Sequence, residues 1–154
     1  ALTGMRLGEI TNLHWQDIDL NRRLITVSNS KTFQTKSGRC RVIPVGEEVY
    51  RMLLRRSTLD NNGVFVFQRN GKKLNSDFVS KKFKKSVLKS KLNSAVHFHS
   101  LRHTYATWLV QNGVNIYQVQ KLLGHSDIKT TQVYSHLAAS ELHDAVNKIN
   151  LSLN

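Results

Sequence analysis

The chain has 154 residues, of which 40% are hydrophobic and one is proline, and it contains no low-complexity run. Its length suits a single domain with a buried core, and no apolar run approaches the roughly 20 residues of a membrane-spanning helix. The 23 Lys and Arg residues against ten Asp and Glu give a net charge of +13, which predicts a polyanionic partner.

The positive charge is concentrated in the first two-thirds of the chain. Residues 22–56 and 69–91 carry nine basic side chains each, whereas acidic residues outnumber basic ones in 127–154. A solubilising surface is the alternative, but ordinary surfaces intersperse both signs. A membrane partner is not indicated, since no amphipathic helix pairs a broad apolar face with these lysines. The single cysteine, Cys40, cannot form an internal disulfide, which is typical of a cytoplasmic protein.

Apolar periodicity, β-branched runs and turn residues predict the elements of the first half. They are a helix at 6–15, a hairpin with strands at 24–28 and 39–45, a helix at 47–56 and a short extended piece at 64–67. Because proline cannot donate a ladder hydrogen bond, Pro44 places its strand at an edge or near its end. In the helix at 47–56 the predicted buried face is Val49, Met52 and Leu53.

Asn70-Gly71 predicts a turn, and helical periodicity dominates after it. A long basic helix at 76–90 has an apolar stripe made of Phe78, Val79, Phe83, Val87 and Leu88. In the next helix, FHSLRHTYATWLVQNG, the apolar positions are 101, 105, 108 and 109, and Gly113 is the expected C-terminal cap.

The last part of the sequence predicts three further helices. Gly124 ends the first of them, NIYQVQKLLG, and Ser126 or Asp127 can cap a short helix that runs through Tyr134. Ser140 can cap a final helix. The chain is therefore predicted to be mostly helical with one small hairpin.

The first candidate chemical motif is HSLRH, at 99–103. On a helix His99 and Arg102 share a face, and an arginine fork together with a histidine donor suits a phosphate. A helix with exposed polar residues is the alternative. His99 and His103 also have the spacing of two zinc ligands, but the pattern offers no third ligand, so no metal is expected.

The second candidate is Arg6, which follows the Thr3-Gly4 turn in the first turn of a predicted helix. Free backbone N–H groups and the helix dipole favour an anion at this place. Glu9, three residues further on, can pair with Arg6 and fix its direction. An ordinary ion pair on the surface is the alternative.

Five segments together carry a resemblance. TGMRLGEI, TKSGRCRVIP, HSLRHTYAT, LLGHS and the following Tyr134 stand in the order and approximate spacing of the catalytic domain of tyrosine recombinases, a family that includes phage integrases and Xer-type resolvases. The resemblance runs from Ala1 to about Leu137 and implies the fold of that domain, which is mostly α with a small antiparallel β-hairpin or sheet (α+β). It implies site-specific cleavage and rejoining of double-stranded DNA through a 3′-phosphotyrosyl intermediate, without a cofactor.

The resemblance also implies roles for individual residues. Arg6 and Arg102 resemble the phosphate-clamping arginines, Tyr134 resembles the nucleophile, and Glu9 resembles the acidic partner of the first arginine. The remaining catalytic positions would be Lys36, His99 and His125. The family's lysine stands eight residues before a strand-closing proline, as Lys36 does before Pro44, although Lys31 in the same hairpin is an alternative.

The chemistry is consistent with this set. The ten acidic residues are scattered rather than clustered for Mg²⁺, so arginines and histidines would stabilise the charge of the transition state. A tyrosine with a pKa of about 10 needs nearby cations or a base such as His99, and a lysine can protonate the leaving oxygen. Local sequence alone favours a different reading of Tyr134, as a packing residue at the edge of the Val133/Leu137 face.

The basic segments are expected to contact the DNA backbone. The predicted contacts are Arg39, Arg41, Lys72, Lys73, Lys81, Lys82, Lys84 and Lys85. Residues 1–154 are expected to form a C-terminal catalytic domain that lacks the upstream helices and the DNA-clamping domain of the family. Residues 138–154 are expected to form a helical tail, which either packs on its own domain or docks on a neighbouring protomer in a tetramer on DNA. The alternatives in function are a type IB topoisomerase-like enzyme and an inactive DNA-binding module.

Overall fold

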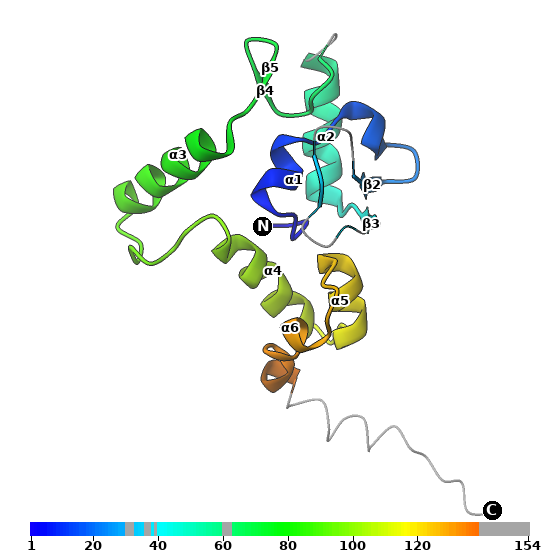
Figure 1. Ribbon diagram of the computed structural model, residues 1–154, viewed down its shortest axis with the longest axis vertical. Helices are drawn as coiled ribbons and strands as arrows, with labels where there is room; N and C mark the ends of the chain where they lie inside the picture. The colour runs from blue at the N-terminus through cyan, green and yellow to red at the C-terminus, as the bar shows by residue number, and fades with distance from the viewer. Residues whose placement is uncertain (30–32, 36–37, 39, 60–62, 139–154) are drawn as a thin grey trace, which may run out of the picture.

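The computed structural model describes residues 1–29, 33–35, 38, 40–59 and 63–138. Helices pack around a small antiparallel sheet, which confirms the predicted α+β class (Figure 1). Lys31, Lys36, Arg39 and the helix predicted after Ser140 lie outside the described residues. No helix in the described part of the chain is long and apolar enough to cross a membrane.

The first helix, α1 (Leu7–Thr11), is shorter than the predicted 6–15. The Asn12 side chain donates a hydrogen bond of 2.8 Å to the Gly8 carbonyl and ends the helix. The chain then leaves helical geometry, because His14 forms an isolated antiparallel bridge with Phe65. A short 3-10 turn, η1 (Trp15–Asp17), leads into the sheet.

The sheet consists of β1 (Ile18–Asp19), β2 (Leu24–Val27) and β3 (Arg41–Pro44) in the order β1-β2-β3. Ile25 of β2 lies opposite Ile43 of β3 in an antiparallel register, and both side chains are buried. The predicted hairpin is therefore confirmed. Pro44 is the last residue of β3, which is an edge strand among the described residues, in agreement with its missing N–H.

The helix α2 (Glu47–Leu59) covers the sheet and buries Val49 and Leu53. Met52, the third predicted core residue, is 40% exposed. A small hairpin of β4 (Gln68–Arg69) and β5 (Lys72–Lys73) follows, and its turn is formed by Asn70 and Gly71 with positive φ angles, as predicted.

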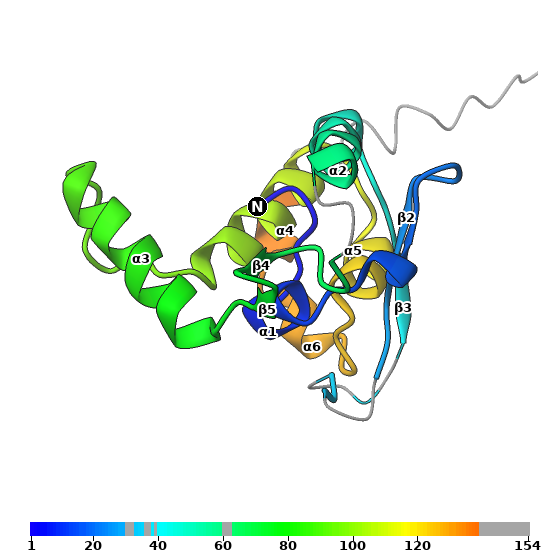
Figure 2. The same cartoon turned by 90° about the horizontal axis from the view of Figure 1, so that it is seen from above.

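The long basic helix α3 (Ser76–Lys89) projects from the body of the molecule (Figures 1 and 2). Its side chains all belong to the described part of the chain, and only Val87 is buried. Phe78 and Leu88 of the predicted apolar stripe are 37% and 56% exposed. Helical periodicity therefore predicted the helix correctly but overestimated how much of it packs.

The C-terminal part of the described chain, from Ser100 to Ala138, forms a second core. It consists of α4 (Ser100–Gln111), α5 (Ile116–Leu123), α6 (Lys129–Gln132) and a 3-10 turn, η2 (Ser135–Ala138). The buried residues of this core are Ala106, Val110, Val119, Leu123 and Tyr134.

The buried positions of α4 are shifted by one residue from the apolar positions 101, 105 and 109 of the sequence pattern. Arg102, Ala106 and Val110 point inward, whereas Trp108, a fourth apolar position of that pattern, is 47% exposed. The apolar pattern alone does not predict this face, because it includes the buried guanidinium of Arg102. Tyr134 also lies just after the short helix that was predicted to contain it, in the turn between α6 and η2.

Candidate active site

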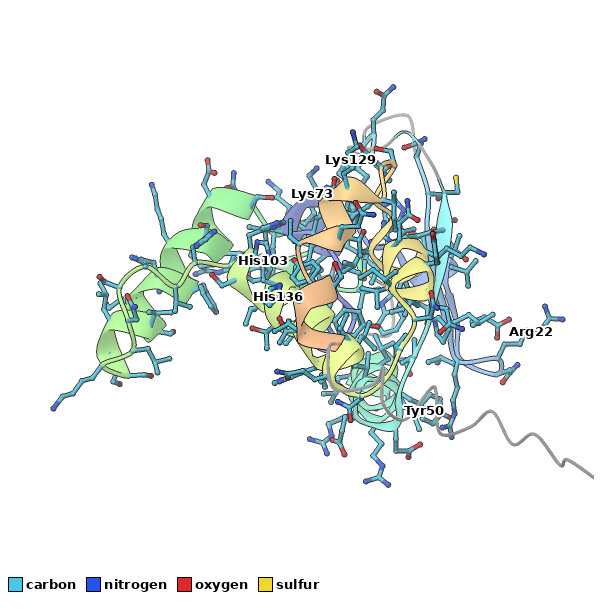
Figure 3. All side chains as sticks on the ribbon, turned by 90° about the horizontal axis from the view of Figure 1, so that it is seen from below. Arg22, Tyr50, Lys73, His103, Lys129 and His136 are labelled. Carbon is cyan, nitrogen blue, oxygen red and sulfur yellow. The ribbon has the colours of Figure 1, made fainter. Side chains whose placement is uncertain are left out.

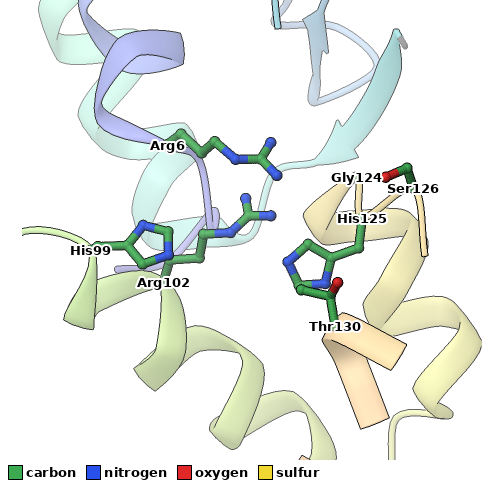
Figure 4. Close-up of a pocket in the computed structure, with 7 residues that line it drawn as sticks. All are labelled: Arg6, His99, Arg102, Gly124, His125, Ser126 and Thr130. Carbon is green, nitrogen blue, oxygen red and sulfur yellow. The ribbon is translucent and has the colours of Figure 1, made fainter. Parts of the chain in front are cut away.

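One pocket brings together side chains that are far apart in the sequence (Figure 4). It lies between the start of α1, the start of α4 and the corner after α5. Among the described residues its lining is Arg6, His99, Arg102, Gly124, His125, Ser126 and Thr130. Four of these residues were predicted from three separate motifs, and no described lining residue is a carboxylate. The pocket therefore has the composition of an anion-binding site.

Arg6 stands at the N-terminus of α1, and its direction is set by Glu9. The Arg6 Nη1 atom lies 3.0 Å from Glu9 Oε1, and the Arg6 backbone N–H donates to Glu9 Oε2 at 2.7 Å. The Glu9 side chain is 1% exposed, whereas that of Arg6 is 20% exposed. Glu9 is thus an internal anchor, and the predicted pair differs from an ordinary ion pair on the surface.

Glu9 has a second cationic partner that was predicted to contact DNA. Both terminal nitrogens of Arg41 donate to the Glu9 carboxylate, at 2.9 and 2.7 Å, and its side chain is 7% exposed. In this structure Arg41, which was predicted to contact DNA, forms an internal ion pair instead of facing the surface. Burial tends to raise the pKa of Glu9, but hydrogen bonds from Arg41 and the charges of Arg41 and Arg6 hold it below its ordinary value. Glu9 is consequently ionised at neutral pH.

Arg102 is buried, with 3% of its surface exposed, and is held by two backbone carbonyls. Its Nη1 donates to the Gly4 carbonyl at 2.7 Å, and its Nη2 donates to the Leu123 carbonyl at 2.6 Å. Gly4 has a φ of +61°, and a Cβ there would lie 2.4 Å from the Tyr105 ring, so glycine is required at this turn. The Thr3-Gly4 turn thereby positions the Gly4 carbonyl, one of the two that accept hydrogen bonds from Arg102.

The charge of Arg102 is only partly compensated. Carboxylates of the described residues form ion pairs with Arg6 and Arg41, but with Arg102 they form none. Burial and then the neighbouring Arg6 lower the pKa of Arg102 to about 10, so the guanidinium remains protonated at neutral pH. A buried cation with carbonyl partners alone leaves an excess of positive potential in the pocket.

His125 enters the pocket from the corner after α5. Gly124 takes the left-handed conformation that ends α5, with a φ of +67°, and turns the chain toward the pocket. The His125 Nδ1 atom lies 2.8 Å from Thr131 Oγ1. Burial, followed by the charges of Arg102 and Arg6, lowers the pKa of His125 to about 4. His125 is therefore a neutral imidazole at pH 7, with Nε2 as its remaining polar atom.

His99 lies on the opposite side of the pocket from His125, beside Arg102 (Figure 4). Its ring meets that of His103 edge-on, with centroids 5.0 Å apart. Burial and then the neighbouring His103 and Arg102 lower the pKa of His99 from its ordinary value. The pocket thus presents two charged arginines and two histidines whose neutral forms are favoured.

Tyr134 is not among the described residues that line the pocket. It is 7% exposed, and its hydroxyl lies 2.5 Å from His103 Nδ1. Figure 3 labels His103 on α4 and His136 on η2, the turn that directly follows Tyr134, and α4 packs against η2. Burial raises the pKa of Tyr134, although the charge of Arg102 opposes this effect. In this state Tyr134 is a packing residue, as its local sequence suggested.

Sequence reasoning missed the roles of Arg41 and His103. His103 stands four residues after His99 and was considered only as a zinc ligand. Arg41 was counted with the surface cations, although strand alternation places it on the same face as the buried Ile43 and Val45. That alternation was the signal that could have identified Arg41 as an inward-facing residue.

The predicted DNA-contacting lysines lie on β5 and α3, apart from the pocket. Lys72, Lys81, Lys82 and Lys85 are exposed. Lys73, also exposed, lies 2.9 Å from Asn12 Oδ1, and the half-buried Lys84 contacts the Ser94 carbonyl. Lys72 and Lys73 thus lie on the β4–β5 hairpin, and the other four lysines lie on the projecting helix α3.

The family of the chain follows from comparison with known proteins. Residues 1–141 match the Phage integrase family, and the chain belongs to it. A tyrosine recombinase of Thermosipho africanus is 36% identical over 95% of this chain and 50% of that protein. The tyrosine recombinase XerA of Pyrococcus furiosus is 34% identical over 97% of this chain and 51% of that protein. The chain therefore spans about half the length of these curated relatives.

Solved structures confirm the fold. The crystal structure of XerA recombinase superposes with a TM-score of 0.77 at 29% identity, covering 98% of this chain and 55% of that chain. The Tn1549 transposon integrase, in complex with a circular intermediate DNA, gives a TM-score of 0.79 at 26% identity, covering 93% of this chain and 55% of that chain. The catalytic domain of bacteriophage HP1 integrase gives 0.66 at 28% identity, covering 99% and 79%. The fold is that of the tyrosine recombinase catalytic domain.

Proposed function

We propose that this chain cleaves and rejoins DNA strands at a specific site by the chemistry of a tyrosine recombinase. One observation carries the proposal: Arg6, Arg102 and two histidines from distant segments converge on one pocket that has excess positive charge. Such an arrangement suits a phosphodiester whose nonbridging oxygens gain charge during displacement. Membership of the Phage integrase family supports it.

The proposed reaction begins with attack of the Tyr134 hydroxyl oxygen on phosphorus, while the phenolic proton passes to a base, for which the neutral His99 is the proposed acceptor. The bond from phosphorus to the 5′-oxygen breaks, and a 3′-phosphotyrosyl ester forms, which conserves the energy needed for rejoining. Arg6 and Arg102 donate to the nonbridging oxygens, and the neutral His125 offers a further hydrogen bond through Nε2. The leaving 5′-oxygen takes a proton, for which Lys36 remains the proposed donor.

Catalysis requires a change in the position of Tyr134. Its hydroxyl is engaged by His103 in the described structure, away from the pocket lining. We propose that the short segment from α6 to η2 moves when DNA is bound and brings the hydroxyl to the phosphate held by Arg102. Proximity to Arg102 would then lower the pKa of the phenol and favour its attack.

Double-stranded DNA is the proposed substrate and partner. The pocket would hold the scissile phosphate, and the lysines of β5 and α3 would contact neighbouring phosphates. Self-association as a tetramer on DNA, through residues 138–154, remains part of the proposal. Rejoining to a partner strand would distinguish the protein from a topoisomerase, which rejoins the same strand.

A non-catalytic DNA-binding module is the second candidate, and the burial of Tyr134 favours it. A pool of nicked suicide duplexes of randomised sequence separates the two candidates. On such a substrate the short cleaved fragment diffuses away, rejoining becomes impossible, and any covalent intermediate accumulates. We expect a protein–DNA adduct that Tyr134→Phe abolishes while duplex binding persists. Binding without any adduct, or an adduct that survives in Tyr134→Phe, would contradict the proposed chemistry.

A further inference from the structure

Arg41 joins three segments of the molecule, two of which, α1 and α5, adjoin the pocket. It is the first residue of β3 and reaches Glu9 on α1 through both terminal nitrogens, at 2.9 and 2.7 Å. Its Nε donates to the Leu122 carbonyl near the end of α5, at 3.0 Å. A single buried side chain thus connects the sheet, the helix after Arg6 and the corner before His125.

The contact with Glu9 acts on Arg6. Each carboxylate oxygen of Glu9 is shared, so that Oε1 accepts from Arg6 Nη1 and Arg41 Nη1, and Oε2 accepts from the Arg6 backbone and Arg41 Nη2. A carboxylate gripped by a two-pronged guanidinium has one allowed orientation. Arg41 therefore fixes the plane of Glu9, and Glu9 in turn fixes the direction of Arg6.

The contact with α5 acts on the other side of the pocket. Leu123, directly after the residue whose carbonyl Arg41 holds, supplies the carbonyl that accepts from Arg102. Gly124 lies against the Arg41 side chain, since a Cβ there would be 2.8 Å from Arg41 Cδ. The position of Arg41 consequently determines where the corner that carries His125 can lie.

We infer that Arg41 is a positioning residue for the reaction, which aligns Arg6 through Glu9 and the His125 corner through Leu122. Arg41 acts from behind the pocket, because its guanidinium is buried and all its described partners are Glu9 and the α5 backbone. This inference rests on the proposed strand cleavage, since alignment matters only if the pocket performs chemistry on a phosphate.

The test compares Arg41→Gln and Arg41→Lys with the unmodified protein in the rate of adduct formation. The substrate is a duplex recovered from the unmodified protein's adducts with the randomised nicked pool. Arg23→Gln is the matched control, because Arg23 forms an ion pair of 2.7 Å with Glu47 in which both side chains are 47% exposed and neither lines the pocket. Thermal unfolding and duplex affinity are measured for each variant, and Arg41→Lys retains the charge if Arg41→Gln does not fold.

We expect Arg41→Gln to slow adduct formation on the order of a hundredfold, the effect of small misplacements in an active site, with unchanged duplex affinity. Arg41→Lys should recover only part of the rate, because an ammonium cannot grip both carboxylate oxygens. In a Glu9→Gln background the further effect of Arg41→Gln should be much smaller. A methylphosphonate at the cleaved position removes the charge that Arg6 meets, so it should also reduce the difference between Arg41→Gln and the unmodified protein.

Three outcomes would overturn the inference. The first is a loss of duplex affinity at an unchanged cleavage rate, which would make Arg41 a DNA contact. The second is an equal loss of rate in Arg23→Gln, or a loss that the methylphosphonate leaves unchanged, which would indicate general destabilisation. The third is Arg41→Gln reacting as fast as the unmodified protein. Absence of an adduct with the unmodified protein would instead contradict the proposed function, and the inference would fall with it.

Discussion

His103 Nδ1 lies 2.5 Å from the Tyr134 hydroxyl, and this hydrogen bond holds the proposed nucleophile in the second core. Both partners come from segments that also serve the pocket, because His103 directly follows Arg102, and Tyr134 follows α6, which contains Thr131, the partner of His125. A movement of Tyr134 out of the second core would therefore begin close to Arg102 and His125, the pocket residues that would hold the phosphate.

Replacing His103 should favour the state in which the Tyr134 side chain has left the second core and is exposed. We expect His103→Phe to remove a hydrogen bond that contributes about 1 kcal/mol and to raise the population of exposed Tyr134 roughly fivefold. Fluorine NMR of protein with fluorotyrosine at position 134 measures this population. His136→Phe on the exposed side of η2 is the matched control. Equal spectra for the His103 variant and the control would show that the hydrogen bond does not hold Tyr134.

The rate of adduct formation should depend more on the planar shape of the Arg102 guanidinium than on its charge. Arg102→Lys keeps a cation but cannot donate to the Gly4 and Leu123 carbonyls while also facing the phosphate. We expect adduct formation to slow by a factor of about a hundred or more, the usual effect of losing one transition-state donor. Arg22→Lys, at an 80% exposed side chain, is the control and should react normally. A lysine variant with the normal rate would contradict the arrangement described for Arg102.

His125 should make stability depend on pH. Its pKa is about 4 in the folded protein against an ordinary value of 6.5, so the unfolded chain binds the extra proton first as pH falls. The stability linked to His125 is present above about pH 6.5 and is lost progressively as pH falls toward 4. Thermal melts across this range measure the loss, and His125→Gln should flatten the profile, whereas the exposed His136→Gln should not. An unchanged profile in His125→Gln would contradict the burial of a neutral imidazole.

The lysines of α3 should contribute to DNA binding through phosphates. Lys81→Ala and Lys85→Ala, at exposed positions one helical turn apart, are each expected to weaken binding of a random duplex at low salt. Each change should reduce the slope of log affinity against log salt by about one, because one counterion fewer is released. Lys129→Ala on α6 is the control. If the slopes of Lys81→Ala and Lys85→Ala equal that of the unmodified protein, the duplex does not contact this face of α3.

The sequence predicted the pocket better than the packing around it. Arg6, His99, Arg102 and His125 each belong to a short motif, and the structure brings all four together. Their convergence follows from tight turns with local signals, such as Gly4 and Gly124, which have positive φ angles in the structure. Glycine at such positions is visible in a sequence because few other residues tolerate that backbone.

Two of the remaining errors share one physical cause, which is the burial of charged residues. Periodicity assumes that apolar side chains face inward, so it missed the inward faces of Arg41 and Arg102, whose partners are distant in the chain. Tyr134 illustrates the opposite difficulty. Its local pattern predicted packing and the resemblance implied chemistry, and the structure shows the packed state.

The carbonyl cradle of Arg102 has a thermodynamic consequence. A buried guanidinium held by two neutral oxygens keeps further N–H donors that an incoming anion can accept from. A phosphate that enters the pocket supplies the missing countercharge, so its binding energy is added to the conformational stability of the domain. By linkage, substitutions that strain the Gly4 or Gly124 corners should be tolerated better on DNA than off it. The nucleic acid would then act as a removable structural component of the protein's own core.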